Sequence, residues 1–176
     1  LTEPKRRTLA SKLAQTYNAP RWSGEIADCS MPMVLDTYSR CSYKCLYCFA
    51  FFQKAIGRSA KSYGAEFPTS LNVKKVKRIF TDPDSSQFGG YVKRRIAIQW
   101  GGMSDPFDEY EREYGVTLEL LKFFREIEYP ICFSTKGTWW TQDPRYVEVF
   151  KGASHLNVKV SIITLNESKA ARIEVG

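Results

Sequence analysis

The residues of this sequence best suited to chemistry are three cysteines that lie within eight positions. Cys41, Cys45 and Cys48 form the pattern C-x3-C-x2-C in the segment CSYKCLYC. Three thiolates on one short loop are able to bind three irons of a [4Fe–4S] cluster. The fourth iron then has no protein ligand, and an open position is what chemistry at a metal requires. We therefore expect an oxygen-sensitive [4Fe–4S] cluster at this loop.

Zinc is the alternative occupant of such a loop. Structural zinc sites also use closely spaced cysteines, but they need four ligands in a closed tetrahedron. The candidates for a fourth ligand are Cys29, Cys132 and His155, and none of them stands at a customary spacing. The clustering of three out of five cysteines also does not suit a disulfide framework. The spacing therefore favours the iron–sulfur cluster.

The segments around the cysteines predict strands that alternate with helices. Parallel neighbours need crossover connections, so this order favours a parallel sheet. We expect an α/β fold, and specifically a partial parallel β/α barrel with roughly four β/α units. Apolar runs predict buried strands at 33–35, 95–100, 131–134 and 158–163. Apolar periodicity and capping residues predict helices at 46–56, 72–82, 116–127, 144–150 and 167–173. Residues 58–71 and 83–90 read as loops, because they carry Gly and Pro.

The segments that follow the four predicted strands carry the other candidate residues. They are the cysteine loop and the stretches 101–107, 134–137 and 161–165. In parallel α/β folds, reactive groups gather where the carboxyl ends of the strands meet. The paired Gly101 and Gly102 would let the backbone approach a ligand closely, although a simple turn is the alternative. We therefore predict one site at this edge of the sheet.

The cysteine loop resembles that of the radical S-adenosylmethionine superfamily. The resemblance implies that the amino and carboxylate groups of S-adenosylmethionine chelate the open iron. It implies that one electron from the cluster cleaves a carbon–sulfur bond, and that the resulting 5′-deoxyadenosyl radical abstracts hydrogen from a substrate. Tyr47 is then expected near the adenine, with core packing as its alternative role. The segment with Gly101, Gly102 and Asp105 is expected to meet the cofactor's amino group.

From about Asp36 to Gly176 the chain also resembles the spore photoproduct lyase-like group, sometimes described as DNA repair photolyases. The resemblance implies that Ser104 and Lys136 contact the cofactor, with Lys136 near its carboxylate, and that Ser161 lies near the ribose. The chemistry agrees, because a buried carboxylate favours a cation and ribose hydroxyls favour short polar partners. The alternative for Lys136 is a surface lysine at a loop tip.

Gly102 departs from the lyase pattern. In that pattern a cysteine two residues before the matched serine returns hydrogen to the product radical, and this chain has glycine there. Glycine has no thiol hydrogen to transfer. We therefore expect cofactor cleavage without efficient repair of spore photoproduct.

Length and composition indicate how the chain is organised into domains. The 176 residues, 43% of them hydrophobic, predict one domain with a packed core at 31–176 and an N-terminal arm at 1–30. The superfamily core has more β/α units than we count here. We therefore expect truncation at the C-terminus, with another chain or segment completing the barrel, and trimming before Leu1.

Several partners follow from the sequence and the resemblance. The net charge of +7 suits either a nucleic acid partner or an ordinary solvated surface. No apolar run approaches the ~20 residues of a membrane span, and the polar start lacks the apolar centre of a signal peptide, so we expect a cytoplasmic protein with no membrane contact. The resemblance implies an external one-electron donor of flavodoxin or ferredoxin type.

Three functions stay open at this stage. The first is a radical S-adenosylmethionine enzyme that acts on a nucleic acid or another macromolecule. The second is a non-catalytic iron–sulfur or zinc module that binds nucleic acid, and the third is a radical enzyme that modifies a peptide or protein. Trp139 and Trp140 would stack on a base or cover the rim of the sheet, and His155 is expected to be structural.

Overall fold

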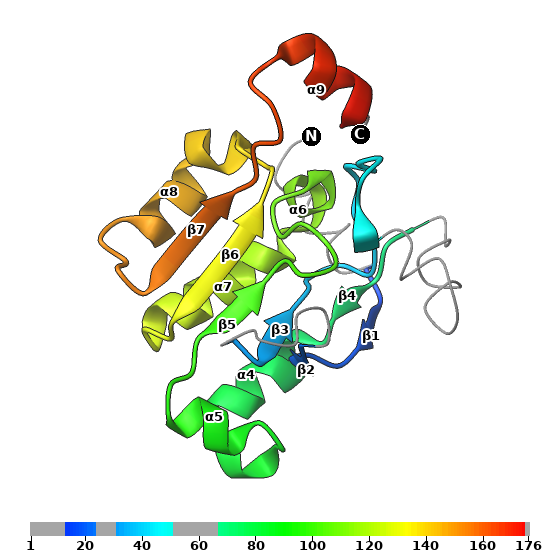
Figure 1. Cartoon of the computed structure of the whole chain (residues 1–176). Helices are drawn as coiled ribbons and strands as arrows, with labels where there is room; N and C mark the ends of the chain where they lie inside the picture. The colour runs from blue at the N-terminus through cyan, green and yellow to red at the C-terminus, as the bar shows by residue number, and fades with distance from the viewer. Residues whose placement is uncertain (1–12, 24–30, 51–66, 175–176) are drawn as a thin grey trace.

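The computed structural model describes residues 13–23, 31–50 and 67–174 (Figure 1). Its centre is a five-stranded sheet in the order β2-β3-β5-β6-β7. The strands from β3 to β7 run parallel, and β2 pairs antiparallel with β3. The chain is therefore α/β, as predicted, with a mixed and mostly parallel sheet whose edge strands β2 and β7 do not close into a barrel. The strands are β2 (Arg21–Trp22), β3 (Met33–Leu35), β5 (Ile98–Trp100), β6 (Ile131–Thr135) and β7 (Leu156–Val160).

A second, two-stranded sheet and eight helical segments complete the described residues. In the small sheet, β1 (Gln15–Tyr17) and β4 (Ser70–Leu71) pair in parallel. The helical segments are α4 (Val73–Thr81), η2 (Pro83–Ser85), α5 (Gly89–Lys93), α6 (Glu109–Tyr114), α7 (Val116–Glu126), η3 (Trp139–Gln142), α8 (Pro144–Phe150) and α9 (Glu167–Ile173). None of these described helices has the length and hydrophobicity needed to cross a bilayer.

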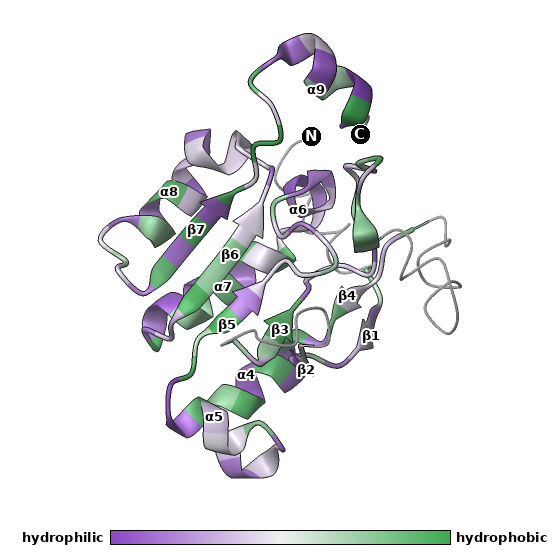
Figure 2. Cartoon of the chain, in the orientation of Figure 1, coloured by the Kyte–Doolittle hydropathy of each residue, from purple (hydrophilic) through white to green (hydrophobic). Residues whose placement is uncertain are grey.

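The core lies between the sheet and the helices α4, α7 and α8, which cover one face of it (Figure 1). Alternate strand residues point to this face, so β5 and β6 show the pattern of burial expected for period-2 alternation. Hydrophobic residues run along β3, whereas hydrophilic residues predominate on α9 (Figure 2). The buried strand residues are Met33, Leu35, Ile98, Trp100, Ile131 and Phe133, and the helices add Val76, Phe80, Leu120, Leu121, Phe124, Tyr146 and Val149.

The opposite face of the sheet carries polar residues. The amide of Gln99 on β5 donates to Ser134 Oγ on β6 at 2.8 Å, and Lys159 Nζ on β7 donates to Gln99 Oε1 at 3.1 Å. This row crosses three parallel strands just before they end. These hydrogen bonds therefore link β5, β6 and β7 near their carboxyl ends.

Several predicted segments have other bounds or contents in the structure. The strand predicted at 158–163 lies at Leu156–Val160, because β7 pairs with β6 in register from Ile131–Leu156 to Thr135–Val160. The strand predicted from 95 begins at Ile98, after Arg95 in the left-handed region at φ 54°. The supposed loop at 83–90 contains η2 and the start of α5. The arm at 1–30 contributes β2 to the main sheet and β1 to the small one.

Gly89 explains why the prediction failed in the third of these segments. A Cβ at this position would lie 2.2 Å from the carbonyl oxygen of Pro83. The glycine therefore permits a close approach between α5 and η2 instead of marking a loop. The helix predicted at 46–56 lies mostly outside the described residues, where only Phe49 and Ala50 are helical.

Glu111 is a fully buried carboxylate that joins three elements. It accepts the hydroxyls of Tyr38 and Tyr146, and the backbone N–H groups of Thr117 at 2.7 Å and Leu118 at 2.8 Å. The two N–H groups belong to the first turn of α7, which has no intrahelical partners for them. A negative charge at this end of a helix is favourable. Glu111 therefore fixes α7 against α6 and α8.

We predict that Glu111→Gln destabilises the protein by about 1–3 kcal/mol, because an amide nitrogen in place of one oxygen leaves buried donors unpaired. Urea unfolding monitored by tryptophan fluorescence measures the change. Glu113→Gln on the exposed side of α6 is the control and should change stability by less than about 0.5 kcal/mol. Equal stabilities of the two variants would contradict the role assigned to Glu111.

Candidate functional site

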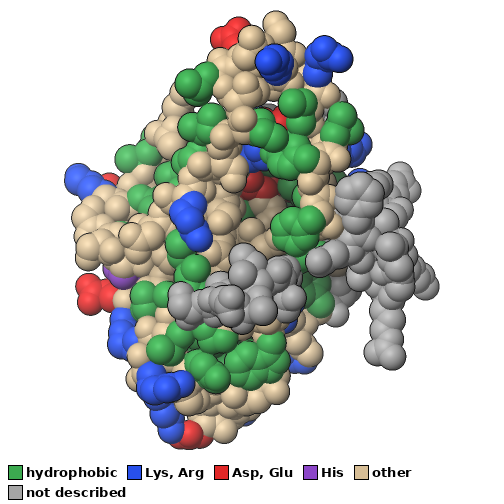
Figure 3. Space-filling model, viewed as in Figure 1, with side chains coloured by type: hydrophobic (Ala, Val, Ile, Leu, Met, Phe, Trp, Pro, Cys, Tyr) green, Lys and Arg blue, Asp and Glu red, His purple; other side chains and the backbone are tan. Residues whose placement is uncertain are grey.

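All ten residues predicted for the site line one pocket at the carboxyl edge of the sheet. The cysteine loop follows β3, and the other residues follow β5, β6 and β7. Figure 3 shows a hollow on this face of the molecule, with charged side chains inside it and hydrophobic side chains around it. The ten residues are Cys41, Cys45, Tyr47, Cys48, Gly101, Gly102, Ser104, Asp105, Lys136 and Ser161. Parallel pairing of the four strands is what brings these distant segments together.

The start of the cysteine loop is fixed to the first turn of α6. The backbone N–H of Ser42 donates to Asp108 Oδ2 at 3.0 Å, and the hydroxyl of Tyr43 donates to the carbonyl of Phe107 at 3.0 Å. Asp108 is fully buried and also accepts the N–H groups of Tyr110 and Glu111 as the N-cap of α6. The same carboxylate therefore starts a helix and holds the loop on which the cysteines lie.

The three thiols of the loop line the pocket but are not gathered around one point. Among the described residues, no group of three or more His, Cys, Asp or Glu side chains is arranged to hold a metal ion. Burial raises the pKa of Cys41 and of Cys45, so both thiols are protonated at neutral pH without a cation. A bound metal reverses this, because a coordinated thiol loses its proton. The donor types and their place fit a cluster, and binding would have to draw the thiols together.

Neither of the two described candidates for the fourth ligand of zinc lines this pocket. Cys132 on β6 and His155 before β7 do not line the pocket. Burial lowers the pKa of His155, its backbone carbonyl accepts the N–H of Ile131 at the opposite end of β6, and its Nε2 has no hydrogen-bond partner among the described residues. Cys29 lies outside the described residues.

The glycine segment after β5 comes close to β6 and leaves one polar group unpaired. Gly101 has φ 92°, and a Cβ there would lie 2.5 Å from the carbonyl oxygen of Ser134, so both backbone conformation and space require glycine. Ser104 is 5% exposed, and its Oγ has no hydrogen-bond partner among the described residues. Buried polar groups without a partner are rare in folded proteins. An unpaired hydroxyl in the lining of a pocket indicates a position where a ligand would bind.

Asp105 lines the pocket, but protein donors occupy both of its carboxylate oxygens. Oδ1 accepts the hydroxyl of Thr135 at 2.6 Å and the N–H of Phe107 at 2.9 Å, and Oδ2 accepts the N–H of Lys136 at 2.6 Å. Burial raises the pKa of Asp105, and the hydrogen bond from Thr135 opposes that rise. This geometry gives Asp105 the task of joining the glycine segment to the end of β6.

Lys136 is not a surface lysine at a loop tip. Its side chain is 17% exposed, lines the pocket and forms an ion pair with Glu174. Tyr47 donates to the same oxygen of Glu174 at 2.9 Å, and the ammonium of Lys136 lies 5.1 Å from the centre of the tyrosine ring. Burial lowers the pKa of Lys136, but hydrogen bonds with Glu174 and Tyr47 outweigh it and raise that pKa. The lysine is therefore a charged group already paired with a carboxylate.

The other candidates fall outside the pocket or at its edge. Ser161 is exposed, and its N–H continues the β6–β7 pairing by donating to Thr135 at 2.8 Å. Trp139 and Trp140 both belong to η3 and donate their indole N–H groups to the carbonyls of Phe107 and Gly137. Trp140 stacks on Phe107 with ring centres 4.9 Å apart. The tryptophans therefore support the rim.

The basic residues of α4 and of the turn before β5 do not line the pocket. Lys74, Lys75 and Arg78 are on the exposed side of α4, as a solvated face requires. Lys93, Arg94 and Arg95 precede β5 and so lie at the amino edge of the sheet, opposite to the pocket. Neither cluster supplies charge to the candidate site.

Sequence reasoning missed four acidic residues that organise this edge. Asp36 and Asp108 hold loops, Glu111 holds α7, and Glu174 pairs with Lys136. Only Asp36 could have been identified from the sequence, because it directly follows an apolar strand, where functional polar residues are often found in parallel sheets. The partners of the other three are separated from them by turns or by long stretches of chain, and local patterns do not show such pairs.

Comparisons of this chain with protein-family models, with curated proteins and with solved structures found no match.

We predict that Gly102→Cys destabilises the protein without placing a thiol in the pocket. A Cβ at position 102 would lie 2.9 Å from Val34 Cγ1 and 3.1 Å from Arg21 Nη2, and neither of those residues lines the pocket. Forcing atoms into such a space costs about 1–3 kcal/mol. Gly90→Cys is the matched control, since nothing lies within 4 Å of a Cβ there. Urea unfolding of both variants measures the difference, and a Gly102→Cys protein as stable as Gly90→Cys would contradict the prediction.

Proposed function

We propose that this chain is the core of a radical S-adenosylmethionine enzyme. The observation that carries the proposal is the single pocket lined by Cys41, Cys45 and Cys48 together with the residues that follow β5, β6 and β7. A loop with three thiols and a neighbouring pocket with a cation and an unpaired hydroxyl are what a cluster and a zwitterionic cofactor need. In this proposal the three cysteines hold a [4Fe–4S] cluster, and the cofactor binds beside it.

When bound, the cluster supplies the electron that cleaves S-adenosylmethionine reductively, so that hydrogen is abstracted from a substrate. The chain's own residues bind and orient the cofactor. Lys136 offers a charged ammonium to its carboxylate, and the Oγ of Ser104 offers a buried donor or acceptor. Gly101 and Gly102 allow the backbone to form the wall of the pocket, and Ser161 lies at its edge.

The ion pair between Lys136 and Glu174 supports the role of Lys136. In this structure the ammonium and the hydroxyl of Tyr47 both contact one carboxylate oxygen of Glu174. A carboxylate therefore already lies at the place where we propose that the cofactor's carboxylate binds. Binding of the cofactor would replace Glu174 at this ammonium.

The partners of the proposed enzyme follow from its chemistry. Reductive cleavage consumes one electron, which an external donor of flavodoxin or ferredoxin type would supply. The substrate would be a nucleic acid or another macromolecule. Gly102 has no thiol hydrogen to return to a product radical, and a side chain there would point to Val34 and Arg21. Repair of spore photoproduct by the route of the lyase is therefore not part of this proposal.

The first test of the proposal concerns the cluster. Anaerobic reconstitution should give about four irons and four sulfides per chain, because three thiolates hold the cluster and its fourth iron needs none. Replacing any one of Cys41, Cys45 and Cys48 with alanine should abolish this content. Cys132→Ala is the control and should keep it, since Cys132 does not line the pocket.

Two outcomes would contradict the proposal. Tightly bound zinc without sulfide would identify a zinc module. Four irons per chain without formation of 5′-deoxyadenosine, in the presence of cofactor and a strong reductant, would identify a non-catalytic cluster protein.

The second test concerns Lys136. Lys136→Ala should weaken binding of S-adenosylmethionine by about 1.5–3 kcal/mol, the cost of losing a hydrogen bond to a charged group. This corresponds to roughly 10- to 150-fold in affinity, measured by isothermal titration of the anaerobic protein. Glu174→Gln should bind at least as tightly as the wild type, because it removes the competing carboxylate.

Lys159→Ala is the matched control for this test. Lys159 lies on β7 one strand away and does not line the pocket, so its loss should leave affinity unchanged. Cluster content should be equal in all three variants. Unchanged affinity in Lys136→Ala would refute its role.

A further inference from the structure

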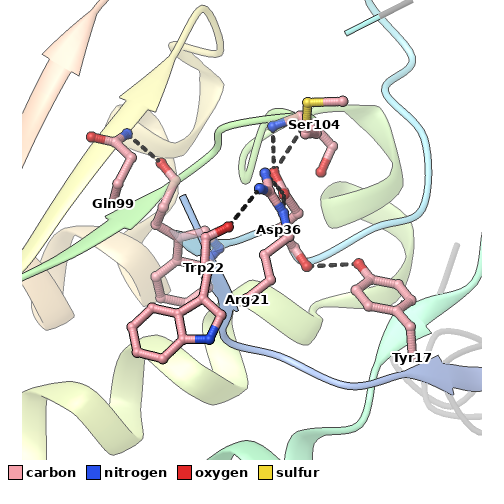
Figure 4. A network of polar contacts seen from close by, with 8 residues as sticks. Tyr17, Arg21, Trp22, Asp36, Gln99 and Ser104 are labelled. Atoms are coloured by element: carbon pink, nitrogen blue, oxygen red, sulfur yellow. Dashed lines mark hydrogen bonds and ion pairs between the residues drawn. The ribbon is translucent and has the colours of Figure 1, made fainter. Parts of the chain in front are cut away.

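Asp36 is a buried carboxylate at the carboxyl end of β3 that holds the glycine segment from outside the pocket. It is 7% exposed. Its Oδ1 accepts two consecutive backbone N–H groups, from Met103 at 2.6 Å and from Ser104 at 3.0 Å. Figure 4 shows Asp36 at the centre of this network. Met103 and Ser104 line the pocket, and Asp36 does not.

The second oxygen of Asp36 is paired with a cation from another strand. Arg21 on β2 donates to Oδ2 through Nε at 3.3 Å and through Nη2 at 3.0 Å (Figure 4). A buried charge needs such a partner, because removing it from water is costly. The hydroxyl of Tyr17 on β1 donates to the backbone carbonyl of Asp36 at 2.6 Å. Both β1 and β2 thus help to fix one aspartate.

Asp36 and Asp105 hold consecutive residues of the same short segment. Asp105 joins the segment to Thr135 and Lys136 on the β6 side, and Asp36 joins Met103 and Ser104 to the end of β3. Between these two anchors, the Oγ of Ser104 is the buried atom that has no partner among the described residues. The N–H groups of Met103 and Ser104 are satisfied by Asp36, which does not line the pocket, so they need no acceptor from a ligand.

We propose that Asp36 is a positioning residue for cofactor binding. By accepting the N–H groups of Met103 and Ser104, it fixes the segment that carries the buried, unpaired hydroxyl of Ser104 in the lining of the pocket. Asp36 itself does not touch the ligand. The inference rests on the proposed function for the identity of that ligand, S-adenosylmethionine, whereas the anchoring of the segment stands on the contacts alone.

The experiment compares Asp36→Ala, Asp36→Asn and wild-type protein by two measurements. The first is hydrogen–deuterium exchange at the amides of Met103 and Ser104 without ligand. The second is the affinity for S-adenosylmethionine of the anaerobic, cluster-loaded protein. Alanine removes both anchoring hydrogen bonds, so exchange should become faster and affinity should fall at least about tenfold, since small displacements of binding groups are costly. Asparagine keeps an acceptor oxygen for the two N–H groups, so it should restore protection and most of the affinity.

Glu111→Gln is the matched control for a general loss of stability. It also alters a buried carboxylate that accepts backbone N–H groups, but Glu111 does not line the pocket. It should leave the affinity of the folded protein and the exchange at 103 and 104 unchanged. Equal losses of affinity in Glu111→Gln and Asp36→Ala would overturn the proposal, because they would reduce the role of Asp36 to general stability.

Two further results would overturn it. One is wild-type exchange and affinity in Asp36→Ala. The other is an Asp36→Asn protein as impaired as Asp36→Ala, because then the charge and not the anchoring would matter. If wild-type protein binds a cluster but no cofactor, the proposed function is wrong, and the exchange measurement alone decides whether Asp36 holds the segment.

Discussion

Buried carboxylates that accept backbone N–H groups hold the carboxyl edge of this sheet together. Loops that leave a parallel sheet have no ladder partners for their N–H groups, and such groups cannot stay unpaired when they are buried. Four acidic side chains supply the missing acceptors here. Asp36 takes two N–H groups of the glycine segment, Asp108 takes that of Ser42, and Asp105 and Glu111 serve the ends of β6 and α7. Each of them joins segments that the sheet alone would leave loose.

These four buried carboxylates lie near the pocket although the whole chain has a net charge of +7. The carboxylates are buried and point at backbone donors, whereas many of the basic side chains are on the outer surface of α4 and at the amino edge. Lys136 is different because it reaches the pocket. It is accompanied there by a carboxylate that comes from beyond α9, a segment whose backbone also contacts the cysteine loop through Leu46 and Ile173. The charges near the pocket are thus set by local pairs and not by the sign of the whole chain.

Much of this arrangement was accessible from the sequence, for identifiable reasons. Strand β3 was predicted as a short apolar run, and helices α4 and α7 from apolar residues at helical spacing. Asn72 caps α4 as expected by accepting the N–H of Lys75. The convergence of the ten site residues followed from the rule that parallel strands end at one edge. The short strands β1, β2 and β4 were missed, since two or three residues carry no period and are defined by pairing with distant segments. The sequence shows where Asp105 lies along the chain but not that protein donors occupy both of its oxygens.

Under the proposed function, the final geometry of the cysteine loop would depend on its ligand. Burial disfavours the thiolate form of Cys41 and Cys45, so deprotonation becomes favourable only when a metal supplies positive charge at the same place. Until then the thiols have no strong reason to approach one another, which agrees with three sulfurs that line one pocket without forming a group. The frame around them does not have this freedom, because Asp108 fixes the loop at Ser42 and the Asp36 and Asp105 anchors fix the facing segment. Under the proposed function, cluster binding would draw the thiols together beside a segment that the Asp36 and Asp105 anchors already hold.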